Sequence, residues 1–307
     1  MILDDRKTLL ACIAGTIVSY NYIRSLYLSS QSDWVPVGTI KNLWVHPIKS
    51  CKRKEVFSLF CDELGPRYGE NRDREFVVID EDGVMVTARI APRMMLIDSD
   101  VVDGVLTVTS SDGATARVVL SEVIEQRIVH RASKNGTLVD GLDCGDEVGR
   151  FFSEFLEMPG IRLIYFRPDL FNGRPCTTDP GWWNNPVPKR SDTVRYVDLS
   201  PYHVSTEESL RALNSELETP VASTWFRANI VVDHSSPWDE DRWAEIRMGD
   251  VILQCYKPCT RFRLAPEGPL REKHGQSPIF GVNAGLLKPG FVHVGQTVYV
   301  KYKPSPF

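Results

Sequence analysis

The 307-residue sequence has no dense run of lysine and arginine, no internal repeat and no low-complexity segment. Its formal net charge is −4, from 36 basic and 40 acidic residues. Nucleic-acid-binding proteins usually carry clustered basic residues, often interleaved with aromatic side chains. The composition therefore argues against general nucleic-acid binding, although it leaves room for a local basic pocket that holds a small anion.

Closely spaced cysteines are also absent. The seven cysteines are scattered and odd in number, so they outline no disulfide framework. This usage is typical of a reducing compartment. The nearest pair, Cys255 and Cys259, has no matching Cys/His pair elsewhere and is only a weak zinc half-site.

One long apolar run is present, at residues 9–28. About 20 mostly apolar residues are enough to span a bilayer as a helix. Tyr20, Tyr22 and Tyr27 are typical of a membrane interface, to which Arg24 could extend. No small-residue cleavage site follows, so a retained membrane anchor is favoured over a cleaved signal peptide. The alternative is an amphipathic helix packed on the domain.

The rest of the chain is long enough for two modules and is dominated by strand patterns. Short strand-like runs begin at residue 37 and continue to about 125, with turn signals at Asp82-Gly83, Asp103-Gly104 and Asp112-Gly113. Such spacing predicts a small barrel or sandwich. We expect a β-rich mixed α/β fold with an anchor at 1–30, a linker at 31–36 and modules at 37–165 and 166–303.

Two segments have helical periodicity. Residues 143–156 place several phenylalanines at helical spacing, which indicates a core-facing stripe rather than a cofactor site. Residues 205–217 begin with a capping box, in which Ser205 is the N-cap and Glu208 follows three residues later. Strands are expected at 161–166, 227–232, 251–256 and 297–301, and a long loop at 167–190.

Two strings combine residue types that suit a phosphate and a soft metal. In WVHPIKSC, Lys49 and Ser50 follow the end of a short strand, and a buried phosphate needs such cationic and hydroxyl donors. In YKPCTRF, Cys259 lies two residues from Arg261, and a thiolate is a ligand that soft metals prefer. Together the strings predict an anion pocket and a metal ligand.

Eight strings in a fixed order resemble the MOSC superfamily, and most of all the mitochondrial amidoxime-reducing components. The resemblance covers roughly residues 37–302 and rests on VGTIKNLWVHPIKSC, GENRDREFVVID, GVMVTAR with APR, GLDCG, YVDLSPYHVSTEESL, FRANIVV, YKPCTR and GQSPIFG. It implies a MOSC N-terminal β-barrel module at 37–165 and a MOSC domain at 166–303, behind the membrane anchor.

The resemblance also implies a function. We expect a molybdenum-dependent oxidoreductase that binds a molybdenum-molybdopterin cofactor and reduces small N-hydroxylated compounds, such as amidoximes and hydroxylamines. Electrons would come from cytochrome b5 and cytochrome b5 reductase. Residues 9–28 would hold the protein on the mitochondrial outer membrane, facing the cytosol. Pyridoxal phosphate binding is a further property that the resemblance suggests.

Matching the family position by position assigns ten cofactor-binding residues: Lys49, Ser50, Arg74, Asp198, Leu199, Ser200, Arg227, Asn229, Thr260 and Arg261. Asn229 lies two residues after Arg227, so on a strand both share one face. Its amide could bind the pterin edge or satisfy a buried carbonyl. His46 could be a proton donor or a solvent-facing strand residue.

The chain departs from the family at Phe262. The family motif reads Cys, Ser or Thr, Arg, Cys, and its second cysteine ligates molybdenum, which a phenylalanine cannot do. Cys259 is therefore the candidate metal ligand and catalytic residue. Three explanations stay open: Cys259 substitutes for the missing ligand, the protein is a catalytically weak or silent cofactor-binding or carrier protein, or the short segment 262–275 reflects a gene model that lost an exon.

Overall fold

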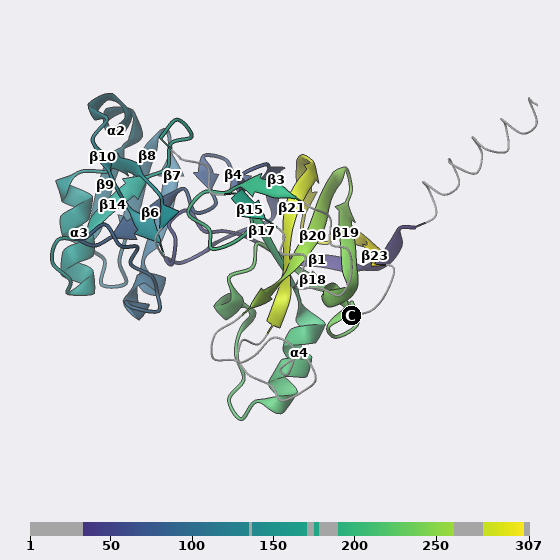
Figure 1. Ribbon diagram of the computed structural model, residues 1–307. Helices are drawn as coiled ribbons and strands as arrows, with labels where there is room; N and C mark the ends of the chain where they lie inside the picture. Colours follow the sequence, from purple (N-terminus) through teal and green to yellow (C-terminus); the bar gives the residue numbers. More distant parts are fainter. Residues whose placement is uncertain (1–32, 135–136, 171–174, 178–189, 261–278, 304–307) are drawn as a thin grey trace, which may run out of the picture.

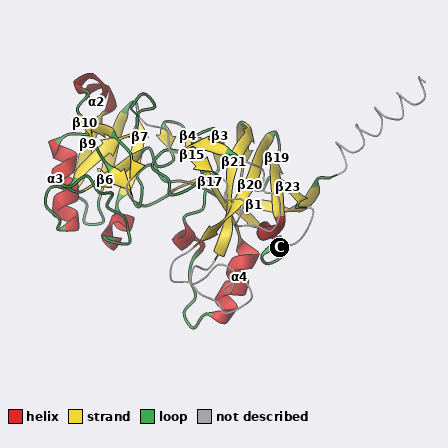
Figure 2. Cartoon of the chain, viewed as in Figure 1, coloured by secondary structure: helices red, strands yellow, loops and turns green. Residues whose placement is uncertain are grey.

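The computed structural model describes residues 33–134, 137–170, 175–177, 190–260 and 279–303. This part of the chain forms two lobes, one around a closed barrel and one of smaller sheets with two helices (Figure 1). The β-rich mixed α/β class is confirmed, with three α-helices among the described residues (Figure 2). The expected anchor at 9–28 lies outside them, and no described helix combines the length and apolarity needed to cross a bilayer.

Seven strands close the barrel in the order β18-β17-β21-β20-β19-β23-β1, because β1 pairs with β18 as well as with β23. The strands are β1 (Val35–Val45), β17 (Tyr202–Thr206), β18 (Ile230–Asp233), β19 (Trp243–Met248), β20 (Val251–Thr260), β21 (Ile279–Lys288) and β23 (Thr297–Tyr302), with β2 (Lys54–Val56) added to β1. Alternate side chains fill the interior: Ile246 and Met248 are fully buried and Arg247 between them is not.

The first described strand, β1, thus belongs to a barrel whose other six strands come from the C-terminal part. The barrel-like arrangement expected over residues 37–125 is replaced by smaller sheets after β1 and β2. The module boundary between 165 and 166 stays a prediction, because pairing of β1 joins both parts of the sequence.

The other strands form small antiparallel sheets. One sheet has the order β10-β13-β14-β6, a second β7-β8-β9, and a third β22-β3-β4-β5. Their strands are β3 (Ser58–Asp62), β4 (Gly65–Tyr68), β5 (Asn71–Arg72), β6 (Phe76–Ile79), β7 (Asp98–Val102), β8 (Val105–Thr109), β9 (Thr115–Val119), β10 (Val129–His130), β13 (Gly141–Asp143), β14 (Arg162–Tyr165) and β22 (Gly290–His293). Two-stranded pairs are β11 (Ser133–Lys134) with β12 (Thr137–Leu138), and β15 (Pro175–Thr177) with β16 (Ser191–Thr193). Because β15 lies within residues 167–190, the loop expected there contains a short strand.

The predicted turns are confirmed with one change. Asp103 and Gly104 have φ of 51° and 70° between β7 and β8, as a tight hairpin turn requires. The hairpin expected around Gly83 is reduced to a single bridge between Ile79 and Met85.

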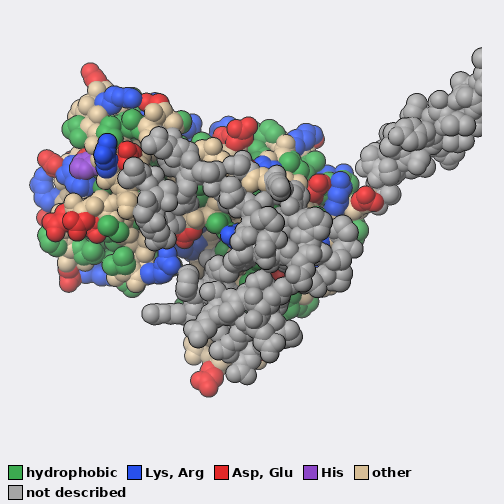
Figure 3. Space-filling model, in the orientation of Figure 1, with side chains coloured by type: hydrophobic (Ala, Val, Ile, Leu, Met, Phe, Trp, Pro, Cys, Tyr) green, Lys and Arg blue, Asp and Glu red, His purple; other side chains and the backbone are tan. Residues whose placement is uncertain are grey.

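Acidic and basic side chains are interspersed over the lobe that carries α2 and α3 (Figure 3).

The described α-helices are α2 (Leu120–Gln126), α3 (Asp146–Leu156) and α4 (Glu207–Glu216). The phenylalanines of α3 are in the core, as expected. The predicted N-cap of α4 is wrong by one residue. Thr206 is the cap, because its Oγ1 accepts a hydrogen bond from Ser209 N at 3.2 Å, whereas Ser205 pairs with Val231 inside β17.

Candidate functional site

Lys49 and Ser50 occupy a tight turn after β1. Cys51 N donates to Ile48 O at 3.2 Å, and Ser50 at the third position has φ of 69°. A turn of this kind needs a left-handed residue there and normally takes glycine. The turn is fixed from outside, since Lys49 N donates to Phe76 O at 2.8 Å at the start of β6. Strained residues that the surroundings hold in place are concentrated at functional sites.

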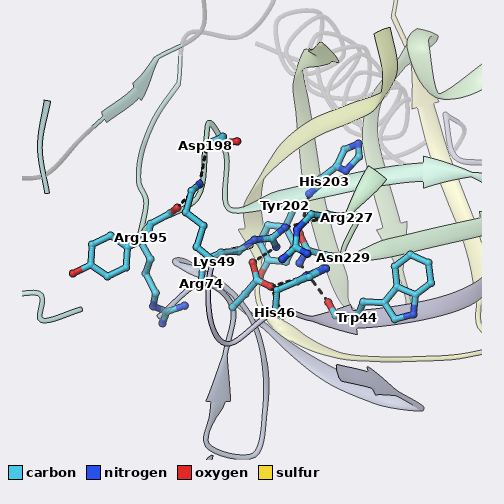
Figure 4. A network of polar contacts seen from close by, with 12 residues as sticks. Trp44, His46, Lys49, Arg74, Arg195, Asp198, Tyr202, His203, Arg227 and Asn229 are labelled. Atoms are coloured by element: carbon cyan, nitrogen blue, oxygen red, sulfur yellow. Dashed lines mark hydrogen bonds and ion pairs between the residues drawn. The ribbon is translucent and has the colours of Figure 1, made fainter. Parts of the chain in front are cut away.

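Arg74 and Arg227 are left-handed too, with φ of 47° and 55°. Arg74 Nη2 donates to Arg227 O at 3.0 Å, across 153 residues of sequence. Arg227 Nη1 in turn donates to Cys51 O at 2.8 Å, next to Ser50 and 176 residues away. Figure 4 shows the side chains of Lys49, Arg74 and Arg227 converging between the barrel and the neighbouring loop. The structure therefore brings together four residues that the sequence assigned to one pocket.

The Arg227 guanidinium has a spare donor. Its Nη2 atom is buried and has no hydrogen-bond partner among the described residues. Burial first, and then the nearby charge of Arg74, lower the pKa of Arg227 to about 9. An anion would relieve both effects and supply the missing acceptor, since a buried unpaired donor is costly and a guanidinium binds phosphate oxygens strongly. This atom fits a buried phosphate group.

Lys49 reaches the loop that the family resemblance places beside the pterin. Its Nζ donates to Tyr196 O at 2.9 Å and to Asp198 Oδ1 at 2.5 Å. The Lys49 side chain is 7% exposed, whereas that of Asp198 is 62% exposed. The ammonium group thus connects the turn after β1 to the loop that contains Tyr196 and Asp198.

The next two residues of this loop are held by the barrel. Leu199 packs against the small cluster that contains Tyr256. Ser200 is buried, and its Oγ lies 2.6 Å from Tyr202 O and 2.8 Å from Asn283 Oδ1. Asn283 Nδ2 also donates to Pro258 O at 3.1 Å, which links the loop to the strand that carries Cys259.

Asn229 satisfies buried backbone groups. Its Oδ1 accepts from His203 N at 3.1 Å and its Nδ2 lies 3.4 Å from Trp44 O. The expected common strand face with Arg227 is wrong. The 3-10 helix η3 (Ser223–Phe226) has Arg227 as its C-cap, and β18 begins only at Ile230. Asn229 as a cofactor contact stays a prediction.

Sequence reasoning missed Asp73. His46 is fully buried rather than solvent-facing, and its backbone N donates to Asp73 Oδ1 at 2.8 Å. Arg74 Nη1 donates to Asp73 Oδ2. Burial alone would raise the pKa of Asp73, but the Arg74 charge and the His46 contacts outweigh it and hold this pKa well below its usual range. The signal was an acidic residue directly before Arg74.

The neighbouring imidazole is neutral. Burial, followed by the charges of Arg74 and Arg227, lowers the pKa of His46 well below its ordinary value. Its Nδ1 lies 3.4 Å from Asp73 Oδ1. The Asp73 carboxylate therefore balances the positive charge of Arg74 alone, because His46 carries no charge of its own.

Cys259 is half-buried near the end of β20, where the pairing is irregular. Pro258 pairs with Val282 and Thr260 with Ile279, so β21 has one residue more than β20 at this point. Such bulges redirect side chains and often adjoin active sites. The predicted residue Arg261, and Phe262 after it, lie outside the described residues.

Comparison with known proteins identifies the family. The profile of the MOSC N-terminal beta barrel domain matches residues 37–159, and that of the MOSC domain matches residues 191–299. Mitochondrial amidoxime-reducing component 1 of Mus musculus is 34% identical over 287 residues, which cover 86% of this chain and 82% of the relative. The chain belongs to the MOSC-domain family of amidoxime-reducing components.

Other relatives extend the same match. The component 1 protein of Homo sapiens is 34% identical and covers 86% of this chain and 83% of its own length. That of Danio rerio is 32% identical over 97% of this chain and 96% of its own length. In this member of the amidoxime-reducing component family, the match to the MOSC N-terminal beta barrel domain begins within β1. The other six strands of the barrel that contains β1 come from the region of the MOSC domain.

Proposed function

We propose that this protein binds a molybdenum-molybdopterin cofactor and reduces small N-hydroxylated compounds, such as amidoximes and hydroxylamines. The observation that carries the proposal is the buried Nη2 of Arg227, which lacks a partner among the described residues while Nη1 is fixed on Cys51. The names of the relatives, amidoxime-reducing components, supply the substrate class.

Charge balance in the pocket supports an anionic ligand. Asp73 pairs with Arg74 and Asp198 pairs with Lys49. Arg227 has no carboxylate partner in the described part of the chain, so an anion is left to balance its charge. Lys49, Arg74 and Arg227 would hold the phosphate.

Two further segments would complete the site. The loop at 198–200 would lie along the pterin, with Asn229, Thr260 and Arg261 as further contacts, and Cys259 would ligate the metal. When bound, the molybdenum centre supplies oxygen-atom chemistry toward substrate and accepts electrons one at a time from a haem donor. We propose cytochrome b5 and cytochrome b5 reductase as that donor chain. Pyridoxal phosphate binding stays a prediction.

Cofactor content tests the proposal. The full-length protein, purified from a host that makes molybdopterin, should contain pterin and molybdenum, measured by fluorescence of the oxidised pterin and by elemental mass spectrometry. An assay with NADH, cytochrome b5 reductase, cytochrome b5 and benzamidoxime then separates an enzyme from a silent carrier. Protein without pterin would contradict both readings, and pterin-loaded protein without turnover would favour the carrier.

The residue at position 262 should decide the activity. Phenylalanine offers no ligand atom, whereas a thiolate is a strong ligand for a soft metal. We expect Phe262→Cys to raise benzamidoxime reduction at least several-fold per bound pterin, and Cys259→Ala to abolish the activity of the natural chain. Both rates are measured with the same electron-transfer chain.

Two controls accompany this prediction. Cys255→Ala alters a buried thiol on the same strand and should leave the rate per pterin unchanged. Turnover of the natural chain that survives Cys259→Ala and does not respond to Phe262→Cys would show that neither residue governs the metal centre.

We also propose that the protein is anchored in the mitochondrial outer membrane and faces the cytosol. The relatives are named mitochondrial components, and residues 9–28 are apolar enough in sequence to span a bilayer. The full-length protein should stay in the membrane pellet after alkaline carbonate extraction of mitochondria, and a chain that starts at Val35 should not. Release of the full-length protein into the supernatant would contradict the anchor.

A further inference from the structure

Aromatic rings and cations form a patch on the outside of the barrel, where the described chain begins. We call the residues Trp34, Arg247, Tyr299 and Lys301 the Trp34 patch. Arg247 and Tyr299 are directly opposite each other on β19 and β23, and Val35 after Trp34 pairs with Val300. Ile246, Val298 and Val300 are buried, so strand alternation directs the patch outward.

The Arg247 guanidinium is flanked by two rings. Its central carbon lies 4.8 Å from the centroid of Trp34 and 4.8 Å from that of Tyr299. Lys301 Nζ also lies 4.8 Å from the Trp34 ring and pairs with Glu245 at 3.3 Å. Cation–π contacts use the faces of a guanidinium and leave its in-plane N–H groups available.

Those N–H groups are not used within the described part of the protein. No hydrogen bond or ion pair joins the Arg247 side chain to another described residue, and none of its nitrogens is buried. A guanidinium held in position with an open N–H edge suits bidentate binding of a phosphate group. Tryptophan and tyrosine are the side chains that membrane interfaces favour.

The chain length places this patch close to the proposed anchor. Only residues 29–34 separate the apolar run from the barrel strand that starts at Val35. A fully extended chain covers at most about 3.6 Å per residue, so this linker reaches roughly 20 Å. The Trp34 end of the barrel therefore stays near the bilayer surface once the anchor is inserted.

We propose that the Trp34 patch is the face of the barrel that docks on anionic phospholipid headgroups beside the anchor. This inference rests on the membrane anchor proposed above. Because the anchor already holds the barrel at the surface, the patch needs little affinity of its own to set the orientation. One basic residue near an anionic leaflet favours the docked orientation roughly fivefold.

Docking in this way determines where the cofactor pocket lies. β1 runs from the patch to the turn that carries Lys49, and its 11 residues span roughly 35 Å as a strand. With the patch on the membrane, the residues of the candidate site lie roughly that far from the patch along β1, outside the docked face. A soluble substrate and a haem-protein donor can then reach the site from the cytosol.

The test uses the full-length protein in phosphatidylserine-containing vesicles whose headgroups carry a quencher. A fluorescent amino acid is introduced at Pro36, which is exposed opposite Tyr299, or as a control at Glu125, which is exposed on α2. We expect quenching at position 36 to exceed that at position 125 several-fold. Arg247→Gln, with unchanged thermal unfolding, should lower the ratio of docked to undocked protein about fivefold and so remove most of the excess quenching at position 36.

Each outcome decides between the two proposals. Equal quenching at both positions in protein that floats with the vesicles would overturn docking and leave the anchor in place. A protein that does not float with the vesicles would overturn the anchor and the docking together. If the excess quenching at position 36 is unchanged in Arg247→Gln, the Trp34 patch is not what orients the barrel on the membrane.

Discussion

Replacing Arg227 with alanine should leave a folded protein that has lost most of its pterin and molybdenum. The side chain of Arg227 donates one hydrogen bond to Cys51 O through Nη1. Its buried Nη2 has no acceptor among the described residues, so a ligand is left to supply one. A charge-assisted hydrogen bond contributes about 1.5–3 kcal/mol. Its loss weakens binding by roughly 10- to 100-fold. The measurement is pterin content per polypeptide after gel filtration.

Two variants show whether the effect is specific. Arg227→Lys keeps the charge without the planar fork and should retain part of the pterin. Arg93→Ala removes an exposed arginine that pairs with Glu157 in the other lobe and should retain all of it. Normal pterin content in a well-folded Arg227→Ala protein would contradict the assignment of the phosphate pocket.

Asp73→Asn should destabilise the whole protein as well as the pocket. Asp73 is completely buried, accepts from His46 N and balances Arg74, whose side chain is 12% exposed. Removal of one partner of a buried ion pair typically costs about 3–5 kcal/mol. Asparagine keeps one acceptor for His46, so we expect a loss of about 3 kcal/mol. Urea unfolding at pH 7 measures it.

The pH dependence gives a second check. The folded-state pKa of Asp73 is below its unfolded value, so its carboxylate stabilises the protein above about pH 4 and loses this contribution as the pH falls further. The difference between the natural protein and Asp73→Asn should be constant from pH 5 to 8 and shrink below that window. Asp98→Asn, at an exposed pair with Lys52, should cost about 1 kcal/mol or less. Similar losses in the two variants would contradict the buried charge pair.

The pocket was predictable to the extent that its residues stand in recognisable strings. Lys49, Ser50, Arg74 and Arg227 were assigned from sequence, and the fold joins them through Arg227 O and Cys51 O. Residue types at strand ends and a family resemblance are local information, and they were enough to name residues that the fold brings together; the binding of a cofactor by these residues stays a prediction. The strand expected at 251–256 extends to Thr260, so Cys259 lies within β20, at an irregularity in its pairing with β21.

Features that depend on distant partners were not predictable. Asp73 matters because folding buries it against His46 and Arg74, and its position directly before Arg74 in the sequence does not by itself reveal that burial. Arg227 was expected on a strand, but the preceding 3-10 helix ends on it in a left-handed conformation. The N-cap moved from Ser205 to Thr206 because sheet pairing with β18 holds Ser205 extended. Tertiary pairing overrides local propensity in each case.

The pairing of β1 also bears on the order of events during synthesis. Thr39 pairs with Asp233 of β18 and Val35 with Val300 of β23, so the first described strand leaves the ribosome long before the two strands that close the barrel on either side of it. Until then β1 can pair only with β2, which follows it closely in the chain, and contacts of such large sequence separation form slowly. The intervening lobe can fold in the meantime. A nascent chain that stops short of β23 would carry most of its pocket residues yet leave the barrel open along β1, as a substrate for chaperones and proteases.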